Sequence, residues 1–277
     1  MIQDIGFSAY DNNYKARNIE ESDSVFIFRR REVLVKMEGD KVSLPKYKDI
    51  ILDKDMTLDK VVYLFEVDKT PYYLAVNGSE LNLAGYEFAN MNLIRTMKPQ
   101  TLAFATMTAF HLFNWYRTNH YCGCCRGEML HSEKERALKC DGCGNMVFPR
   151  ISPAVIVGIT NGNKILMTKY AGRDYKKYAL VAGFCEIGET AERTVEREVM
   201  EEVGIKVKNI RYYKSQPWGL AGDLLLGYFA EVDGDTTITI DETELAEGTW
   251  IDRDDIEFEE DCVTLTSEMI MHFKKNN

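Results

Sequence analysis

The sequence predicts an α/β fold in its C-terminal half, preceded by a small metal-binding ribbon and an N-terminal α+β region. Three observations lead to this prediction. Apolar runs rich in β-branched residues flank a helical pattern after residue 151, cysteines are paired at close spacing between residues 121 and 150, and a long helical pattern ends the first 120 residues. We therefore expect domains at 1–120, 121–150 and 151–277.

The N-terminal region combines pairs of strands with one long helix. Residues 24–36 and 60–76 each have the pattern of two strands around a polar turn. Residues 99–120 are expected to form a helix opened by Pro99, a position that proline tolerates. Four aromatic residues of this helix form either part of the core or a ligand platform, and core packing is the expectation for such a stripe: Phe110, Phe113, Trp115 and Tyr116.

The next segment has the spacing Cys-x2-Cys-x14-Cys-x2-Cys, formed by Cys122, Cys125, Cys140 and Cys143. Two such knuckles suit one tetrahedral Zn²⁺, and a closed shell of thiolates is typical of a structural site. Two disulfides are the alternative interpretation. Cys124 and His120 are spare candidates for ligands, so a shifted ligand set stays open. The remaining cysteines are expected to be free thiols: Cys124, Cys185 and Cys262.

Residues 183–205 carry a dense set of carboxylates, GFCEIGETAERTVEREVMEEVGI. On a helical wheel its valines form one apolar arc, with Glu198 and Glu201 beside that arc and Glu202 inside it. A carboxylate on the core side of a helix is costly unless it is paired or bound to a metal. We therefore expect a site for hard divalent cations rather than an ordinary solvated acidic face. Gly204 is expected to cap the helix.

Strands on both sides place this helix in a sheet. Residues 154–159 and 164–168 are expected to form a hairpin around Asn161-Gly162, a strong turn signal. A third strand at 178–181 would lead into a loop at Gly183. After the helix we expect strands at 224–232, 236–240 and 250–251 and a closing helix at 264–275.

The acidic segment follows Gly-x5-Glu-x7-Arg-Glu-apolar-x-Glu-Glu-x-Gly-apolar and so resembles the signature of the Nudix hydrolases. With the cysteine segment before it and Ser215-Gln216-Pro217-Trp218 after it, the chain is similar to the NADH pyrophosphatase branch of that family. The resemblance implies a Nudix α/β/α sandwich with a mixed sheet, hydrolysis of NADH or NAD⁺ to nicotinamide mononucleotide and AMP, catalytic Mg²⁺ or Mn²⁺, and a homodimer. Relatives also remove NAD caps from RNA, so the 5′ end of NAD-capped RNA is a further candidate partner.

One departure from the family pattern follows Trp218. The family continues with Pro-Phe-Pro-x-Ser, whereas this chain has Gly219-Leu220-Ala221-Gly222-Asp223. Asp223 at the serine position would repel a phosphate but accept hydrogen bonds from ribose hydroxyls. ADP-ribose or another nucleoside diphosphate derivative is therefore the alternative substrate.

Hydrolysis of a phosphoanhydride needs cations at the phosphate oxygens and an oriented water. Glu198 and Glu202, four residues apart, are expected as the main metal ligands. Glu201 is expected to act as a ligand or as a base that orients the water. Gly183 would let the backbone approach the metal or a phosphate closely. By analogy with the family, Arg197 pairs with a glutamate of the segment such as Glu189.

Residues outside the acidic helix complete the expected site. Glu244 is the candidate for a general base and a further ligand, by its place in the family before Trp250; a solvated loop charge is its alternative. Phe184 would stack on a nicotinamide or adenine ring. Gln216 and Trp218 are expected on a specificity loop. The expected substrate contacts are Phe184, Phe148, Gln216, Trp218 and Asp223, and the first four are also candidates for core packing.

Composition narrows the classes of function. A hydrophobic content of 45% and a charged content of 28% are ordinary for a soluble protein. No apolar run is long enough to span a bilayer, and the N-terminus lacks the shape of a signal peptide, so we expect a cytoplasmic protein without a membrane partner. A net charge of −10 opposes general nucleic-acid binding. It also opposes the non-enzyme alternative, a ligand-sensing regulator built from a zinc ribbon and a Nudix domain.

Overall fold

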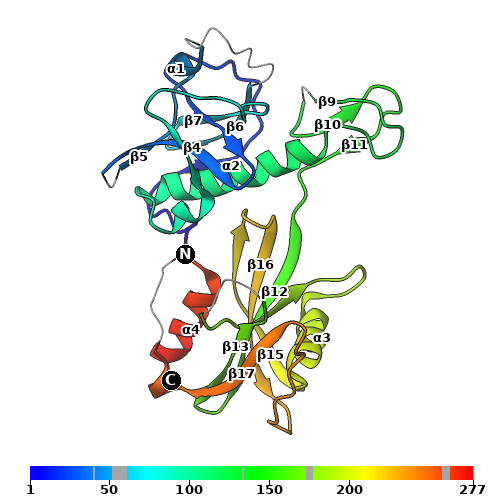
Figure 1. Ribbon diagram of the computed structural model, residues 1–277. Helices are drawn as coiled ribbons and strands as arrows, with labels where there is room; N and C mark the ends of the chain where they lie inside the picture. The colour runs from blue at the N-terminus through cyan, green and yellow to red at the C-terminus, as the bar shows by residue number, and fades with distance from the viewer. Residues whose placement is uncertain (40, 52–60, 133, 173–176, 258–262, 277) are drawn as a thin grey trace. The chain divides into compact units, whose positions relative to one another are not determined.

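The computed structural model describes residues 1–39, 41–51, 61–132, 134–172, 177–257 and 263–276. The chain divides into two compact units (Figure 1). The N-terminal unit contains residues 2–150 and 219–221, and the C-terminal unit contains residue 1 with residues 151–218 and 222–277. The cysteine segment thus belongs to the N-terminal unit, and the short segment after Trp218 clusters with that unit as well.

Two sheets and a long helix build the first part of the N-terminal unit. One sheet has the strand order β1-β6-β7-β2, and the other has the order β3-β4-β5 with β8 paired to β4. The expected strand pairs are present, although Lys60 lies outside the described residues. The strands and short helices are β1 (Tyr10–Asp11), β2 (Ser24–Phe26), β3 (Phe28–Arg29), β4 (Glu32–Glu38), β5 (Lys41–Ser43), α1 (Tyr47–Ile51), β6 (Val61–Val67), β7 (Thr70–Ala75), β8 (Glu87–Asn90) and η1 (Met91–Arg95).

Helix α2 (Gln100–Thr118) begins after Pro99, which is its N-cap. It is buried on most of its circumference, so its aromatic residues lie in the core. Phe28 contacts the rings of Phe110 and Phe113, with centroids 5.4 and 5.2 Å away. The core interpretation of the aromatic stripe is therefore confirmed, since all four of its members are at most 4% exposed. The unit ends in a small antiparallel sheet, β11-β10-β9, formed by β9 (Met129–His131), β10 (Leu138–Cys140) and β11 (Met146–Val147).

The C-terminal unit is a mixed sheet covered by one helix on each face (Figure 1). The strand order is β15-β16-β12-β13-β17, and β14 pairs with β12. Strands β12 and β16 are parallel, and the other neighbours are antiparallel. The elements are β12 (Ser152–Asn161), β13 (Lys164–Tyr170), β14 (Val181–Phe184), α3 (Ala191–Val203), β15 (Val207–Trp218), β16 (Asp223–Val232), β17 (Leu245–Asp252), η2 (Arg253–Asp255) and α4 (Leu265–Lys275).

Each face of this sheet has its own core. Valines of α3 pack against Val155 and Val157 of β12 on one face. Met269 and Ile270 of α4 pack with Ile156 and Ile165 on the other face. The predicted α/β/α sandwich with a mixed sheet is confirmed, as are the hairpin at Asn161-Gly162 and the closing helix. Within the described residues, no helix has the length and apolar character needed to cross a bilayer.

Three expectations about local structure are wrong. Residues 236–240 form no strand, because the N–H of Thr239 donates to the carbonyl of Val203 at the end of α3. Such carbonyls have no partner inside the helix. The third strand covers Val181–Phe184 instead of residues 178–181, so Gly183 is paired with Val155 rather than placed in a loop. Ser215–Trp218 likewise end strand β15 instead of forming a loop.

Candidate active site

Helix α3 has a defined beginning and end. The Thr190 hydroxyl accepts a hydrogen bond from the Arg193 N–H at 3.3 Å, and Gly204 caps the last turn with a φ of 70°. A positive φ favours glycine, so the expected role of Gly204 is confirmed. The valines of α3 are fully buried in the core, and the Glu202 side chain lies on the same side of the helix with only 3% exposure. The position of Glu202 on the core side of the helix, expected from the helical wheel, is therefore confirmed.

Gly183 lies directly against the carboxylate of Glu198. A Cβ added at Gly183 would stand 1.9 Å from Glu198 Cδ and 2.1 Å from each of its oxygens. These distances leave no room for any side chain at position 183. The glycine is thus required by the close approach of strand β14 and a carboxylate of α3, rather than by backbone conformation, since its φ is not positive.

Arg197 organises the carboxylates around it. Its guanidinium donates to both oxygens of Glu189 at 2.8 and 2.9 Å, so the expected pair is present. The same group donates to Glu198 at 2.7 Å, to Glu201 at 3.0 Å and to the carbonyl of Phe184 at 2.9 Å. The hydrogen bonds from Arg197 lower the pKa of Glu189 to about 2. Arg197 therefore ties the start of the helix and strand β14 to the acidic side chains.

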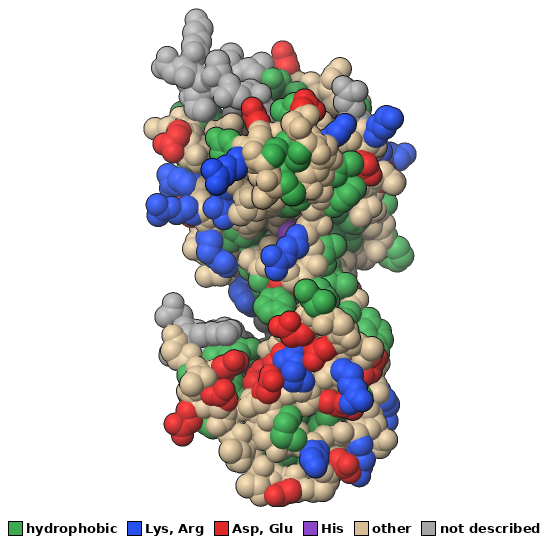
Figure 2. All heavy atoms as spheres, turned by 90° about the vertical axis from the view of Figure 1, so that its right-hand side faces the viewer, with side chains coloured by type: hydrophobic (Ala, Val, Ile, Leu, Met, Phe, Trp, Pro, Cys, Tyr) green, Lys and Arg blue, Asp and Glu red, His purple; other side chains and the backbone are tan. Residues whose placement is uncertain are grey.

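Burial and neighbouring negative charges both disfavour the ionised form of Glu198. Burial raises the pKa of Glu198, Arg197 opposes this, and the carboxylates of Glu201 and Glu244 raise it further. The Glu198 side chain is 12% exposed, whereas that of Glu201 is 59% exposed. Glu244 thus acts on the same site as the acidic helix although it lies far along the chain. Figure 2 shows acidic side chains gathered on the face of this unit that α3 covers.

Oxygen ligands in this arrangement fit a hard divalent cation. Glu198, Glu201 and Glu244 supply carboxylates here, and the backbone at Gly183 comes close to Glu198, whereas Glu202 is buried. Glu198 and Glu201 accept hydrogen bonds from Arg197. The oxygens of the carboxylates, taken as a set, lie farther apart than the sulfur atoms of the four cysteines in the N-terminal unit. Among the described residues, only the cysteines place a full set of ligand atoms within 4.8 Å of one another. A cation at the carboxylates would therefore compete with Arg197 for Glu198 and Glu201.

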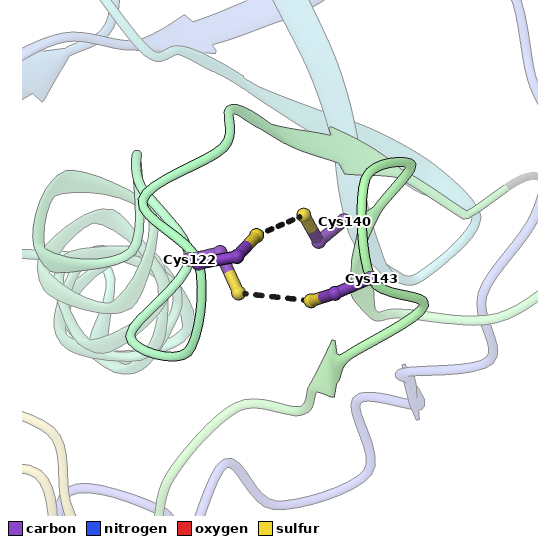
Figure 3. Close-up of side chains that lie close together, drawn as sticks. Cys122, Cys140 and Cys143 are labelled. Atoms are coloured by element: carbon purple, nitrogen blue, oxygen red, sulfur yellow. Dashed lines mark hydrogen bonds between the residues drawn. The ribbon is translucent and has the colours of Figure 1, made fainter.

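The four expected cysteines come together in the N-terminal unit. Figure 3 labels three of them, Cys122, Cys140 and Cys143. The sulfur of Cys122 lies 3.6 Å from that of Cys143, and the sulfur of Cys125 lies 3.4 Å from that of Cys140. A tetrahedral zinc with Zn–S bonds of about 2.3 Å separates its sulfurs by about 3.8 Å, so the cluster fits this ion. Backbone N–H groups of Cys125 and Cys124 lower the pKa of Cys122 to about 6, which favours a thiolate.

The alternatives for this segment are settled in part. The cysteines of the described residues form no disulfide. His120 and Cys124 are exposed and lie outside the cluster. Cys124 and Cys185 are free thiols as expected, whereas Cys262 lies outside the described residues.

The expected substrate contacts differ in their surroundings. Phe184 is 54% exposed and Phe148 is 52% exposed, so neither ring is part of a core. Trp218 is partly buried, and Asp223, which pairs with it in the sheet, is only 7% exposed. Both aromatic rings remain accessible to a ligand, whereas Asp223 offers little surface.

Gln216 requires a correction. Its side chain is fully buried, its amide N–H donates to the Val263 carbonyl at 2.8 Å, and its amide oxygen accepts from the Leu265 N–H at 2.7 Å. The side chain therefore fastens β15 to the start of α4, and we remove it from the substrate contacts. Tyr228 was absent from the sequence-based site; its hydroxyl donates to Glu192 of α3 at 3.3 Å. Tyr228 lies near α3 only because β16 pairs within the sheet, and local sequence does not encode that pairing.

Several known proteins are similar to parts of this chain. Residues 150–271 match the model of the NUDIX domain family. This stretch is therefore similar to a NUDIX domain. The NAD-capped RNA hydrolases NudC of Escherichia coli O9:H4 and of Escherichia fergusonii are each 44% identical to it over 146 residues, which are 52% of this chain and 56% of the relative. The chain thus spans about half the length of the curated relatives it matches. A NUDIX hydrolase structure from Nitrosomonas europaea has 22% identity and a TM-score of 0.47, and it covers 56% of this chain and 90% of its own.

Proposed function

We propose that this protein is a metal-dependent hydrolase that cleaves the diphosphate of NADH or NAD⁺ to nicotinamide mononucleotide and AMP. The supporting observation is the carboxylate of Glu198 held against Gly183 within a Nudix domain, with Glu201 and Glu244 acting on it. Relatives named NAD-capped RNA hydrolase support a substrate that contains NAD. ADP-ribose and the 5′ end of NAD-capped RNA remain alternative substrates.

The roles of the acidic residues follow from their positions. Glu198 and Glu202 would hold Mg²⁺ or Mn²⁺ from adjacent turns of α3, with the backbone at Gly183 beside Glu198. Glu201, the more exposed carboxylate, and Glu244 are the candidates for further ligands or for the base that orients water. When bound, the cation supplies neutralisation of phosphate charge and a more acidic water.

Arg197 has a supporting role in this proposal. It donates to both oxygens of Glu189 and to the Phe184 carbonyl, so it keeps β14 and the first turns of α3 in register with each other. Phe184, which follows Gly183 in β14 and has an exposed ring, is the candidate for stacking on a base. Phe148 and Trp218 are the further aromatic candidates. A cytoplasmic homodimer with structural zinc at the four cysteines completes the proposal.

A product assay tests both the bond and the substrate. NADH, NAD⁺, ADP-ribose and NAD-capped RNA are compared by kcat/KM with Mg²⁺ or Mn²⁺, and the products are separated by chromatography. We expect AMP and nicotinamide mononucleotide from the dinucleotides. Glu198→Gln and Glu202→Gln should each lower kcat by at least ~100-fold, as lost metal-assisted chemistry predicts.

A matched control is available on the same helix. Glu196 is an exposed glutamate that pairs with Arg193 at 2.6 Å, on the side of α3 away from Glu202. Glu196→Gln should keep near-normal turnover. Normal turnover in both Glu198→Gln and Glu202→Gln, with purified substrate, would contradict the metal site. DNA binding without hydrolysis of any dinucleotide would favour the regulator instead.

A further inference from the structure

The C-terminal unit has a cavity on the face of the sheet opposite to helix α3. Its volume is about 410 Å³, and it is lined by strands β15 and β16, by η2 and by the C-terminal half of α4. Pockets for small ligands usually measure about 300–1,000 Å³. Its lining includes four aromatic or histidine rings and two arginines: Tyr213, Phe229, His272, Phe273, Arg211 and Arg253. We call this site the α4 cavity.

Aromatic rings form the walls of the α4 cavity. The Tyr213 ring centroid lies 4.6 Å from that of His272 and 5.3 Å from that of Phe229, and His272 and Phe229 are 5.6 Å apart. Gly158 of β12 makes this cluster fit, because a Cβ there would stand 2.6 Å from a ring carbon of Phe229. The fold thus reserves space for a cluster of π faces, which suits a planar ring.

Positive charge lies at the same cavity. Arg211 and Arg253 both line it, and no carboxylate is among its lining residues in the described part of the chain. The Arg253 guanidinium stacks on Phe273 with its carbon 4.4 Å from the ring centroid. Its Nη1 donates to the Asn276 carbonyl, and its buried Nε has no hydrogen-bond partner among the described residues. The Arg211 guanidinium lies 3.4 Å from the Glu231 carboxylate, and its side chain is 67% exposed. Such an exposed ion pair contributes little to stability. Both guanidinium groups therefore keep donors for an anion, in a chain whose net charge is −10.

We propose that the α4 cavity is a second ligand site that takes a nucleoside monophosphate. The base would stack against the Tyr213 and His272 rings, and the phosphate would bond to Arg211 and Arg253. An uncharged apolar ligand would leave two guanidinium groups unused, and inorganic phosphate would leave the rings unused. The proposal rests on this cavity alone and stands whether or not the acidic helix hydrolyses NADH.

Calorimetric titration of the full chain with AMP tests the proposal. The Glu198→Gln background without added divalent cation weakens competing binding at the acidic helix and leaves the zinc in place. We expect saturable binding of one AMP per chain with a Kd below about 1 mM. Adenosine and inorganic phosphate should each bind at least about tenfold more weakly, because each lacks one half of the recognition.

Two variants and a control locate the bound AMP. Arg253→Gln and Arg211→Gln should each weaken AMP binding at least about tenfold, as expected for lost charge-assisted hydrogen bonds. Lys208→Gln removes a positive charge from the same strand outside the cavity and should change nothing. Because Arg211 is exposed, its variant stays informative if Arg253→Gln fails to fold. Absence of saturable AMP binding, equal AMP affinity in Arg211→Gln and Lys208→Gln, or phosphate binding as tight as AMP would each overturn the proposal.

Discussion

Replacing Gly183 with alanine gives a sharp test of the proposed active site. The added methyl carbon would stand 1.9 Å from Glu198 Cδ, whereas non-bonded carbon atoms settle at about 3.5–4.0 Å. The carboxylate must therefore move by about 2 Å, or the strand must shift away from the helix. A misplacement of about 1 Å at a reacting centre already costs about 100-fold in rate. We expect kcat/KM for NADH to fall at least ~100-fold, which equals about 2.7 kcal/mol of transition-state stabilisation.

The variant should still fold, with a loss of stability that can be measured separately from its loss of activity. Gly183 has no positive φ, and strand β14 stays paired with β12. Arg197 keeps both bonds to Glu189 even when its 2.7 Å bond to Glu198 is lost. Loss of one hydrogen bond to a charged group costs about 1.5–3 kcal/mol, partly offset by the lower chain entropy of alanine. Thermal unfolding in parallel with the product assay separates the two effects.

A double-mutant comparison shows whether Glu198 carries the loss. If alanine acts by displacing this carboxylate, then Gly183→Ala in the Glu198→Gln background should lower kcat/KM little beyond Glu198→Gln alone. Fully multiplicative losses would mean that the methyl group disturbs something else. Turnover of Gly183→Ala within about threefold of the parent would refute the reasoning, because the displaced group would then not matter for the reaction.

Three further predictions concern zinc, pH and folding. Purified, reduced protein should carry about one zinc per chain by elemental analysis, Cys140→Ser should lose it and Cys124→Ser should keep it; no zinc in chelator-free protein would contradict the site. The pKa of Glu189 is lowered from 4.5 to about 2 in the folded protein, so its stabilising effect is complete above pH 4.5 and is lost as the pH falls toward 2. The difference in unfolding free energy between parent and Glu189→Gln should therefore shrink across that window, and a constant difference would count against the pair. Gln216→Leu leaves the buried Leu265 N–H and Val263 carbonyl without their partner and should lower the unfolding free energy by about 2–4 kcal/mol in urea titrations, whereas a negligible change would show that the amide is dispensable.

The sequence by itself determined the features whose chemistry is local. The spacing of the cysteines predicted the cluster of their sulfur atoms. Helical periodicity predicted that Glu202 lies on the core-facing side of α3 together with the valines. Gly204 and the turn at Asn161-Gly162 followed from backbone preferences of a few adjacent residues. Such features need only the neighbours in the chain, so pattern and propensity describe them well.

Only the tertiary structure decided what depends on partners far apart in the chain. Gly183 looked like a loop residue, but its pairing with Val155 makes it part of a strand, and its true constraint is the Glu198 carboxylate. Residues 236–240 have the apolar alternation of a strand, yet the Thr239 N–H donates to the Val203 carbonyl at the end of α3 instead. Gln216 has the polarity of a substrate contact and serves as a buried clamp on α4. In each case a long-range partner satisfies a backbone or side-chain group, and local sequence does not specify which partner that is.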